Sequence, residues 1–186
     1  MYGLILVGGM SSRMGSDKSF LPVKAEKSYM KAYRLLTPFC DKIYFSCRKE
    51  QRINFQEMDI ITDKYAECGP IAGILTAMET YRDQNWLVIA VDMLYTTTEM
   101  IAELIHNRPD NQSIFFGNNQ RVEPLLGIYD RSIYGYLKNA HLSGEFSLNK
   151  ILTASPDVYL CAAEGRNLAS INTPADFEEF NQKLKQ

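Results

Sequence analysis

The chain has 186 residues, of which 46 % are hydrophobic and 23 % charged, values that exclude a mainly disordered protein and predict one domain over residues 1–186. The net charge of −2 argues against a protein that coats nucleic acid. No apolar run approaches the roughly 20 residues of a membrane span, and no signal-peptide pattern is found. We therefore predict a cytoplasmic protein without nucleic-acid or membrane partners.

The charge is unevenly distributed along the chain. Residues 13–34 carry six cations and two acidic residues, a net charge of +4. A positive segment near the N-terminus of an acidic protein indicates a small anionic ligand. A solvated helix face is the preferred interpretation for four of these cations: Lys24, Lys27, Lys31 and Arg34.

Short apolar runs alternate with helical patterns along most of the chain. In chain order, strands are predicted at 3–7, 42–47, 59–61, 86–91, 113–116, 122–129 and 157–161. Helices are predicted at 28–36, at 70–81, after a capping box that opens at Thr96, at 131–140, at 145–153, and after Thr173. This alternation predicts an α/β fold, a single-domain three-layer α/β/α sandwich with a mostly parallel, Rossmann-like sheet. A hairpin over residues 113–129 would make the sheet mixed.

The loop after the first predicted strand has the composition of a phosphate-binding loop. It contains Gly8, Gly9 and Gly15 together with the cations Arg13 and Lys18. Glycines let backbone N–H groups approach a phosphate closely, and cations complement its charge. The spacing matches neither a Walker A loop nor a dinucleotide-binding fingerprint. The alternative is a flexible loop with solvated charges.

Further motifs follow later predicted strands, whose carboxyl ends share one edge of a parallel sheet. Asp63 follows the third strand, and residues 69–73 (Gly-Pro-Ile-Ala-Gly) could admit a flat base or ribose. Asp92 follows the most hydrophobic strand, 86–91. A carboxylate there could hold Mg²⁺, which prefers oxygen ligands and phosphates. The alternatives are a tightly packed helix start for residues 69–73 and a helix cap or surface position for Asp92.

Together these motifs resemble those of the molybdenum cofactor guanylyltransferases, which make molybdopterin guanine dinucleotide from GTP and molybdenum cofactor. The resemblance covers nearly the whole chain, in the family's order. Its motifs are Leu6-Val7-Gly8-Gly9-x-Ser-x-Arg13-Met14-Gly15-x-Asp17-Lys18, then Asp63, 69–73, Asp92-Met93, Arg121-x-Glu123-Pro124 and Asn172-Thr173-Pro174. It implies a sheet of the nucleotide-diphospho-sugar-transferase type. The nucleotide-binding half is then expected at about 1–95 and the acceptor-binding half at about 96–186.

The resemblance also implies roles for individual residues. The nucleotide would be bound by Leu6, Val7, Gly8, Lys18, Asp63 and Asp92. Asp92 would also hold the Mg²⁺ cofactor, and the catalytic residues would be Arg13, Lys18 and Asp92. The acceptor would be bound by Arg121, Glu123 and Asn172. The sequence departs from the family pattern in three places: Leu94 replaces a proline, Ser170 replaces an asparagine, and residues 45–47 lack an asparagine that the family often has after the second strand. These departures leave the contact at residues 45–47 and a second metal ligand open.

The chemistry of nucleotidyl transfer suits these residue types. An anionic acceptor phosphate attacks the α-phosphorus and pyrophosphate leaves, so the barrier lies in bringing two anions together. A cation at Asp92, with Lys18 and Arg13, would stabilise that charge. We therefore predict a Mg²⁺-dependent transferase that moves GMP from GTP to molybdenum cofactor. Its partners would be these substrates and proteins that deliver or receive the cofactor.

Two other functions fit parts of the same pattern. One is a related nucleotidyltransferase that uses CTP or a sugar 1-phosphate acceptor. The other is a non-catalytic GTP-binding or scaffold protein, for which the only support is the pair of departures at Leu94 and Ser170.

Overall fold

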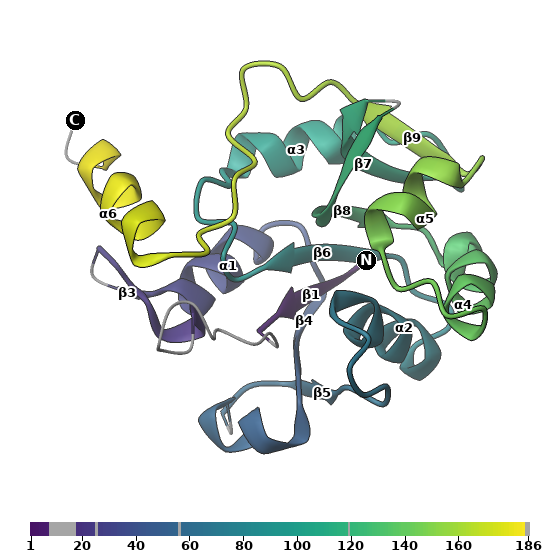
Figure 1. Ribbon diagram of the computed structural model, residues 1–186, viewed down its shortest axis with the longest axis horizontal. Helices are drawn as coiled ribbons and strands as arrows, with labels where there is room; N and C mark the ends of the chain where they lie inside the picture. Colours follow the sequence, from purple (N-terminus) through teal and green to yellow (C-terminus); the bar gives the residue numbers. More distant parts are fainter. Residues whose placement is uncertain (8–17, 25, 56, 119, 185–186) are drawn as a thin grey trace.

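The computed structural model describes residues 1–7, 18–24, 26–55, 57–118 and 120–184. Within these residues a seven-stranded sheet has the strand order β5-β4-β1-β6-β8-β7-β9 (Figure 1). Its strands are β1 (Tyr2–Leu6), β4 (Lys42–Cys47), β5 (Ile60–Thr62), β6 (Trp86–Ala90), β7 (Ser113–Asn118), β8 (Arg121–Tyr129) and β9 (Val158–Cys161). A small separate ribbon pairs β2 (Pro22–Val23) with β3 (Glu26–Lys27).

The predicted sheet is confirmed as mixed but mostly parallel. β1 pairs in parallel with β4 and β6, β4 with β5, and β7 with β9. Only β8 runs against its neighbours β6 and β7 within the part of the sheet that the structure describes. The predicted hairpin over 113–129 is therefore confirmed. Because β1, β4, β5 and β6 are parallel, their carboxyl ends lie at one edge of the sheet.

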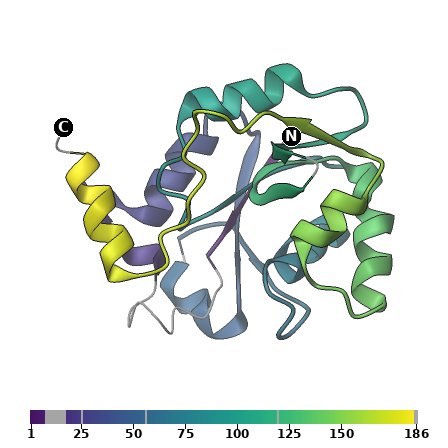
Figure 2. The ribbon, with the colours of Figure 1, turned by 45° about the horizontal axis from the view of Figure 1, so that its top comes forward.

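Helices cover both faces of this sheet (Figures 1 and 2). They are α1 (Ser28–Leu36), α2 (Pro70–Thr80), α3 (Thr98–Asn107), α4 (Tyr134–Leu142), α5 (Leu148–Ala154) and α6 (Pro174–Lys183). Short 3-10 turns lie at η1 (Lys18–Phe20), η2 (Lys49–Phe55) and η3 (Arg131–Ile133). α1 and α3 lie on one face of the sheet, and α2, α4 and α5 lie on the other. The three-layer prediction is confirmed. Among the described residues, no helix combines the length and the apolar character needed to cross a membrane.

One predicted helix start is wrong by a single residue. Thr97, not Thr96, caps α3: its extended backbone lets its side chain accept a hydrogen bond from the N–H of Met100 at 3.4 Å. Thr96 is 3 % exposed, so its side chain points into the protein and not along the helix end. The α6 prediction is confirmed, because Thr173 and Asp176 form a complete capping box.

A second, smaller apolar cluster joins the two ends of the chain. It contains Leu21, Val23, Leu94, Ile171 and Phe180. Leu94, which departs from the family pattern, is a buried member of this cluster with 3 % exposure. The substitution therefore supplies apolar contact that holds the C-terminal segment and α6 beside the N-terminal half, as Figure 1 shows.

Candidate active site

The carboxyl ends of the parallel strands form a continuous hydrogen-bonded edge. The N–H of Val7 donates to Ser46 O at 3.1 Å, and the N–H of Asp63 donates to Cys47 O at 3.0 Å. Leu6 and Val7 are 5 % and 3 % exposed, so their side chains belong to the core. Two predicted site residues of the neighbouring loop, Gly8 and Arg13, lie outside the described residues.

Three residues far apart in the sequence meet beyond this edge. The ammonium of Lys18 donates to Asp92 Oδ2 at 2.9 Å and to Asn172 Oδ1 at 2.6 Å. The side chains of Lys18 and Asp92 are only 15 % and 17 % exposed. Partial burial strengthens such an ion pair relative to one in water. We call Lys18, Asp92 and Asn172 the edge triad.

The backbone of Lys18 is held in place independently of its side chain. Ser28, at the start of α1, donates its hydroxyl to Lys18 O at 2.6 Å. The neighbouring Ser19 donates its hydroxyl to Val7 O at 3.3 Å. The ammonium therefore projects from a turn that is fixed to β1 and α1.

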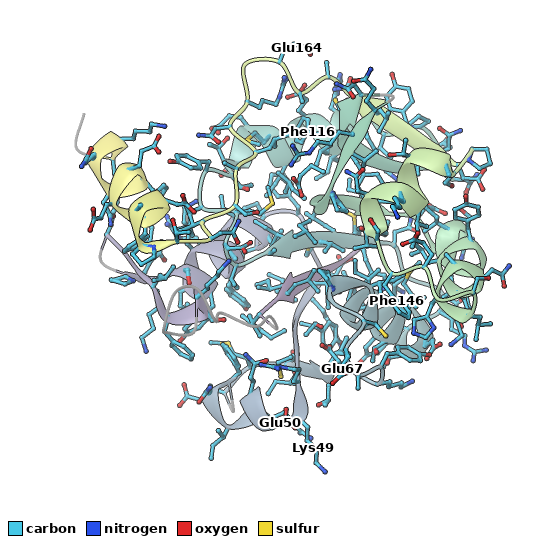
Figure 3. The ribbon with its side chains drawn as sticks, in the orientation of Figure 1. Lys49, Glu50, Glu67, Phe116, Phe146 and Glu164 are labelled. Atoms are coloured by element: carbon cyan, nitrogen blue, oxygen red, sulfur yellow. The ribbon has the colours of Figure 1, made fainter. Side chains whose placement is uncertain are left out.

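Asn172 reaches the triad on the segment between β9 and α6. Arg166 anchors this segment, because its guanidinium pairs with Glu103 of α3 and lies 5.2 Å from the ring centre of Phe116. Figure 3 labels Glu164 on this segment and Phe116 on β7. Farther along, the N–H of Ile171 donates to Asp92 O at 2.9 Å. The segment is thus tied directly to the strand end that carries Asp92.

Asp92 has the donor chemistry expected of a magnesium ligand. Its Oδ1 is buried and accepts no hydrogen bond from the described residues. A buried carboxylate oxygen without a partner is costly unless a cation or ligand group contacts it. No group of three or more His, Cys, Asp or Glu side chains gathers among the described residues.

Asp63 lies at the same edge but has a different partner. The hydroxyl of Ser46 donates to Asp63 Oδ1 at 2.6 Å, which lowers the pKa of Asp63, while burial raises it more and leaves it above the usual range. Ser46 is a residue that the sequence analysis missed. The sequence could have indicated it, because Ser46 lies near the end of β4 and β4 pairs with β5, the strand that Asp63 follows.

The two glycines of residues 69–73 are required by the backbone conformation and by the packing of α2. Gly69 has φ +68°, a conformation that favours glycine, directly before Pro70 at the start of α2. A Cβ on Gly73 would lie 2.1 Å from Ser46 Oγ. Gly73 therefore permits the close packing of α2 on the sheet that keeps Ser46 against Asp63.

Two of the three predicted acceptor residues lie on β8, whereas the third, Asn172, lies in the edge triad. Arg121 is exposed at the start of the strand, and Glu123 is partly buried. Glu123 Oε1 accepts from the N–H of Leu125 at 3.1 Å, not from the edge triad. Burial raises the pKa of Glu123, and the nearby charge of Asp92 adds to this effect.

The interpretation of Lys31 as a solvated surface cation is wrong. Its ammonium donates to Leu94 O at 2.7 Å and to Thr96 O at 3.0 Å, in the turn that follows Asp92. Burial, helped by the charge of Arg34, lowers the pKa of Lys31 to about 8. The other three cations of that set, Lys24, Lys27 and Arg34, are exposed as expected.

Comparison with known proteins identifies the family. The family model for the MobA-like NTP transferase domain matches residues 3–158. A molybdenum cofactor biosynthesis bifunctional protein of Synechocystis is 30 % identical over 97 % of this chain, which spans about half (54 %) of that protein. A probable molybdenum cofactor guanylyltransferase of Carboxydothermus hydrogenoformans is 29 % identical over 95 % of this chain and 92 % of its own length.

A solved structure shows the same fold over the full length. It is the molybdopterin-guanine dinucleotide biosynthesis protein A of Archaeoglobus fulgidus, with a TM-score of 0.81 and 24 % identity, and the match covers 100 % of this chain and 99 % of that one. The family resemblance found in the sequence is confirmed, and the chain belongs to the MobA-like NTP transferase family of nucleotidyltransferases.

Proposed function

We propose that the protein transfers GMP from GTP to molybdenum cofactor (molybdopterin) in a Mg²⁺-dependent reaction that releases pyrophosphate. The observation that carries the proposal is the edge triad, in which a cation and a carboxylate converge beyond the carboxyl ends of β1 and β6. Nucleotides bind at this edge of open α/β sheets. The names of the relatives support GTP and molybdopterin as substrates.

The reaction joins two phosphates and needs no strong base. An ionised oxygen of the acceptor phosphate attacks the α-phosphorus of GTP, the bond from that phosphorus to the bridging oxygen breaks, and pyrophosphate leaves. The ammonium of Lys18, together with the guanidinium of Arg13, complements the charge on the phosphoryl oxygens. Asn172 orients the ammonium through its 2.6 Å contact. Asp92 would hold Mg²⁺, which supplies further charge neutralisation at these oxygens.

The remaining residues divide between the two substrates. We assign Leu6, Val7, Gly8 and Asp63, in the half of the chain that covers about 1–95, to nucleotide binding. We assign Arg121, Glu123 and Asn172, in the half at about 96–186, to acceptor binding. We further propose that the enzyme acts in the cytoplasm and that its partners include proteins that deliver or receive the cofactor.

A panel of substrates tests the proposal. The protein is incubated with Mg²⁺ and one of GTP, CTP or ATP, and with either molybdopterin or a sugar 1-phosphate, and pyrophosphate is measured. We expect release only with GTP and molybdopterin. Preference for CTP or the sugar phosphate would assign a related transferase, and GTP binding without release under any condition would assign a non-catalytic protein.

A further inference from the structure

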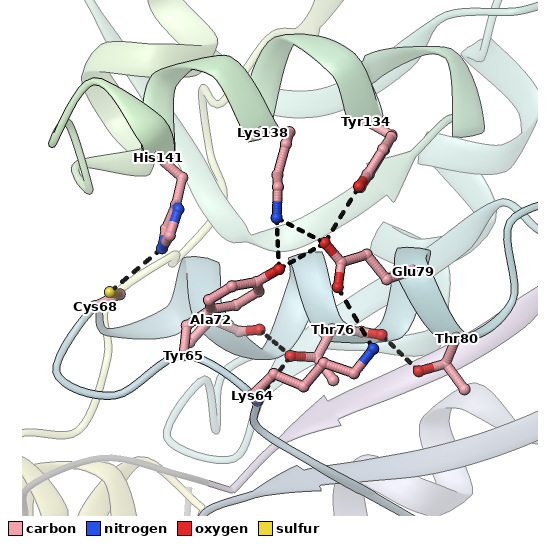
Figure 4. A network of polar contacts seen from close by, with 10 residues as sticks. All are labelled: Lys64, Tyr65, Cys68, Ala72, Thr76, Glu79, Thr80, Tyr134, Lys138 and His141. Carbon is pink, nitrogen blue, oxygen red and sulfur yellow. Dashed lines mark hydrogen bonds and ion pairs between the residues drawn. The ribbon is translucent and has the colours of Figure 1, made fainter.

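The loop from Asp63 to Gly69 and the helices α2 and α4 meet at a single carboxylate (Figure 4). Glu79 Oε1, on α2, accepts hydrogen bonds from the hydroxyl of Tyr65 at 2.5 Å and from the ammonium of Lys138 at 2.8 Å. The hydroxyl of Tyr134 donates to the same oxygen at 3.2 Å. The Glu79 side chain is 13 % exposed. One carboxylate oxygen of this partly buried side chain thus links a loop residue to two residues of α4.

Tyr65 is held through both sides of its hydroxyl. It donates to Glu79, as above, and accepts from Lys138 Nζ at 2.6 Å. The same ammonium lies 4.6 Å from the centre of the Tyr65 ring. Burial raises the pKa of Glu79, but hydrogen bonds from Lys138, Tyr65 and Tyr134 outweigh it and lower that pKa to about 2. The cluster is therefore a charged, fully bonded unit at neutral pH.

Helix α4 contacts the loop at a second point. Cys68 Sγ lies 3.5 Å from His141 Nε2, and the ring of His141 lies 4.6 Å from that of Tyr65. Tyr134, Lys138 and His141 are four and three residues apart, so they share one face of α4. That face holds the loop at Tyr65 and again at Cys68, just before Gly69.

The loop begins at the group proposed to bind the nucleotide. The bond from Ser46 holds one oxygen of Asp63, and the next residue, Lys64, donates its N–H to Thr76 Oγ1 of α2 at 3.0 Å. Beyond Lys64, the side-chain contacts that hold the loop against α2 and α4 come from Tyr65 and Cys68. A loop that is already ordered lowers the entropic cost of binding a ligand.

We propose that Tyr65, Glu79 and Lys138 are positioning residues for the nucleotide: they clamp the loop so that Asp63 and the start of α2 are in place before the nucleotide arrives. The inference rests on the proposed function, because it takes Asp63 as a nucleotide-binding group. None of the three residues touches the reacting atoms, so their effect is on nucleotide affinity and not on the transfer step.

The test is the variant Tyr65→Phe, which keeps the ring and removes only the hydroxyl. We expect the Kd for GTP, measured by calorimetry, to rise about tenfold, equivalent to about 1.4 kcal/mol. At saturating GTP, kcat and the KM for the acceptor stay within about twofold of the parent, since uniform binding alone is lost. Lys138→Met is expected to behave like Tyr65→Phe, and Lys138→Arg to recover most of the affinity.

Lys64→Met is the matched control. Lys64 Nζ lies 3.4 Å from Glu79 Oε2 and its side chain is 54 % exposed, so its contribution is small. We expect its Kd to equal that of the parent. An unchanged Kd for GTP in Tyr65→Phe would overturn the proposal. So would a kcat that falls together with the melting temperature, because that result indicates general destabilisation of the protein.

Hydrogen–deuterium exchange separates this proposal from the assignment of GTP. Amides of residues 64–69 are expected to exchange faster in Tyr65→Phe than in the parent, and at the parent rate in Lys64→Met. If the parent binds another nucleotide in place of GTP, the proposed function fails, and the Kd comparison is made with that nucleotide. Unchanged exchange in Tyr65→Phe would contradict the clamp whatever nucleotide is bound.

Discussion

Lys18 and Asp92 are 74 positions apart in the chain, yet Lys18 Nζ lies 2.9 Å from Asp92 Oδ2 in a partly buried ion pair. The pair forms because β1 and β6 are parallel neighbours whose carboxyl ends lie side by side. Asn172 completes the arrangement from the C-terminal segment. In the proposed reaction, one member of the pair complements phosphate charge and the other holds the metal ion.

Lys18→Ala is expected to weaken GTP binding and slow transfer. The loss of a charge-assisted contact to a phosphate costs about 1.5–3 kcal/mol, so the Kd should rise by roughly 10- to 100-fold. Calorimetry with GTP and pyrophosphate release measure the two effects. Lys42→Ala, an exposed position at the opposite end of β4, is the control and should match the parent. An unchanged affinity and rate in Lys18→Ala would remove Lys18 from the site.

Arg121→Ala is expected to raise the apparent constant for molybdenum cofactor more than that for GTP. Arg121 is exposed on β8, in the half of the chain that we assign to the acceptor. Burial raises the pKa of Glu123, and the charge of Arg121 offsets only part of this effect. Steady-state kinetics with each substrate varied in turn give both constants. Equal increases in the two constants would contradict the acceptor assignment.

Gly73→Ala is expected to destabilise the protein by about 1–3 kcal/mol through overpacking. The new methyl group would lie 2.1 Å from Ser46 Oγ and 3.1 Å from Leu6 Cδ2. Chemical denaturation measures the loss. The added substitution Ser46→Ala should restore part of it, because the closest clashing atom is removed. Gly135→Ala in α4 is the control, since a Cβ there meets nothing within 4 Å, and it should be no less stable than the parent.

Because burial lowers the pKa of Lys31, we expect the free energy of unfolding to rise at alkaline pH. Its folded-state pKa of about 8 is below the ordinary lysine pKa of 10.5, so between these values the unfolded chain binds more protons than the folded one. The free energy of unfolding of the parent, relative to Lys31→Met, should therefore increase from about pH 8 to about pH 10.5, by on the order of 2–3 kcal/mol. Below pH 8 the difference should be flat. A difference that falls as the pH rises through this window would contradict the burial of a charged Lys31.

The order of strands and helices was predictable because it depends on local hydrophobic patterning. Residues 86–91 are apolar enough to be recognised as a buried strand, and Thr173-Pro174 marks a helix start without further information. Asp92 was placed at the carboxyl edge by the same reasoning. These elements need no knowledge of distant contacts.

The contacts made by side chains were less predictable. Lys31 has the sequence context of a surface cation, and only the fold brings the carbonyl oxygens of Leu94 and Thr96 to it. Glu79 and Lys138 are 59 positions apart, and no local pattern couples them. Thr96 and Thr97 are the same residue type in neighbouring positions, so the sequence does not show which one caps α3. In the structure Thr96 is buried and Thr97 is the cap.

The most direct test of the proposed mechanism is Asp92→Asn, which keeps the size of the side chain and removes its charge. GMP transfer to molybdopterin is followed by pyrophosphate release in saturating Mg²⁺, GTP and acceptor, and GTP binding is measured without metal. We expect transfer to fall by at least about 100-fold, by analogy with the loss of one electrostatic stabiliser, and metal-free binding to persist or tighten because a negative charge is gone. Transfer at the parent rate would show that Asp92 holds no catalytic metal ion and would contradict the mechanism.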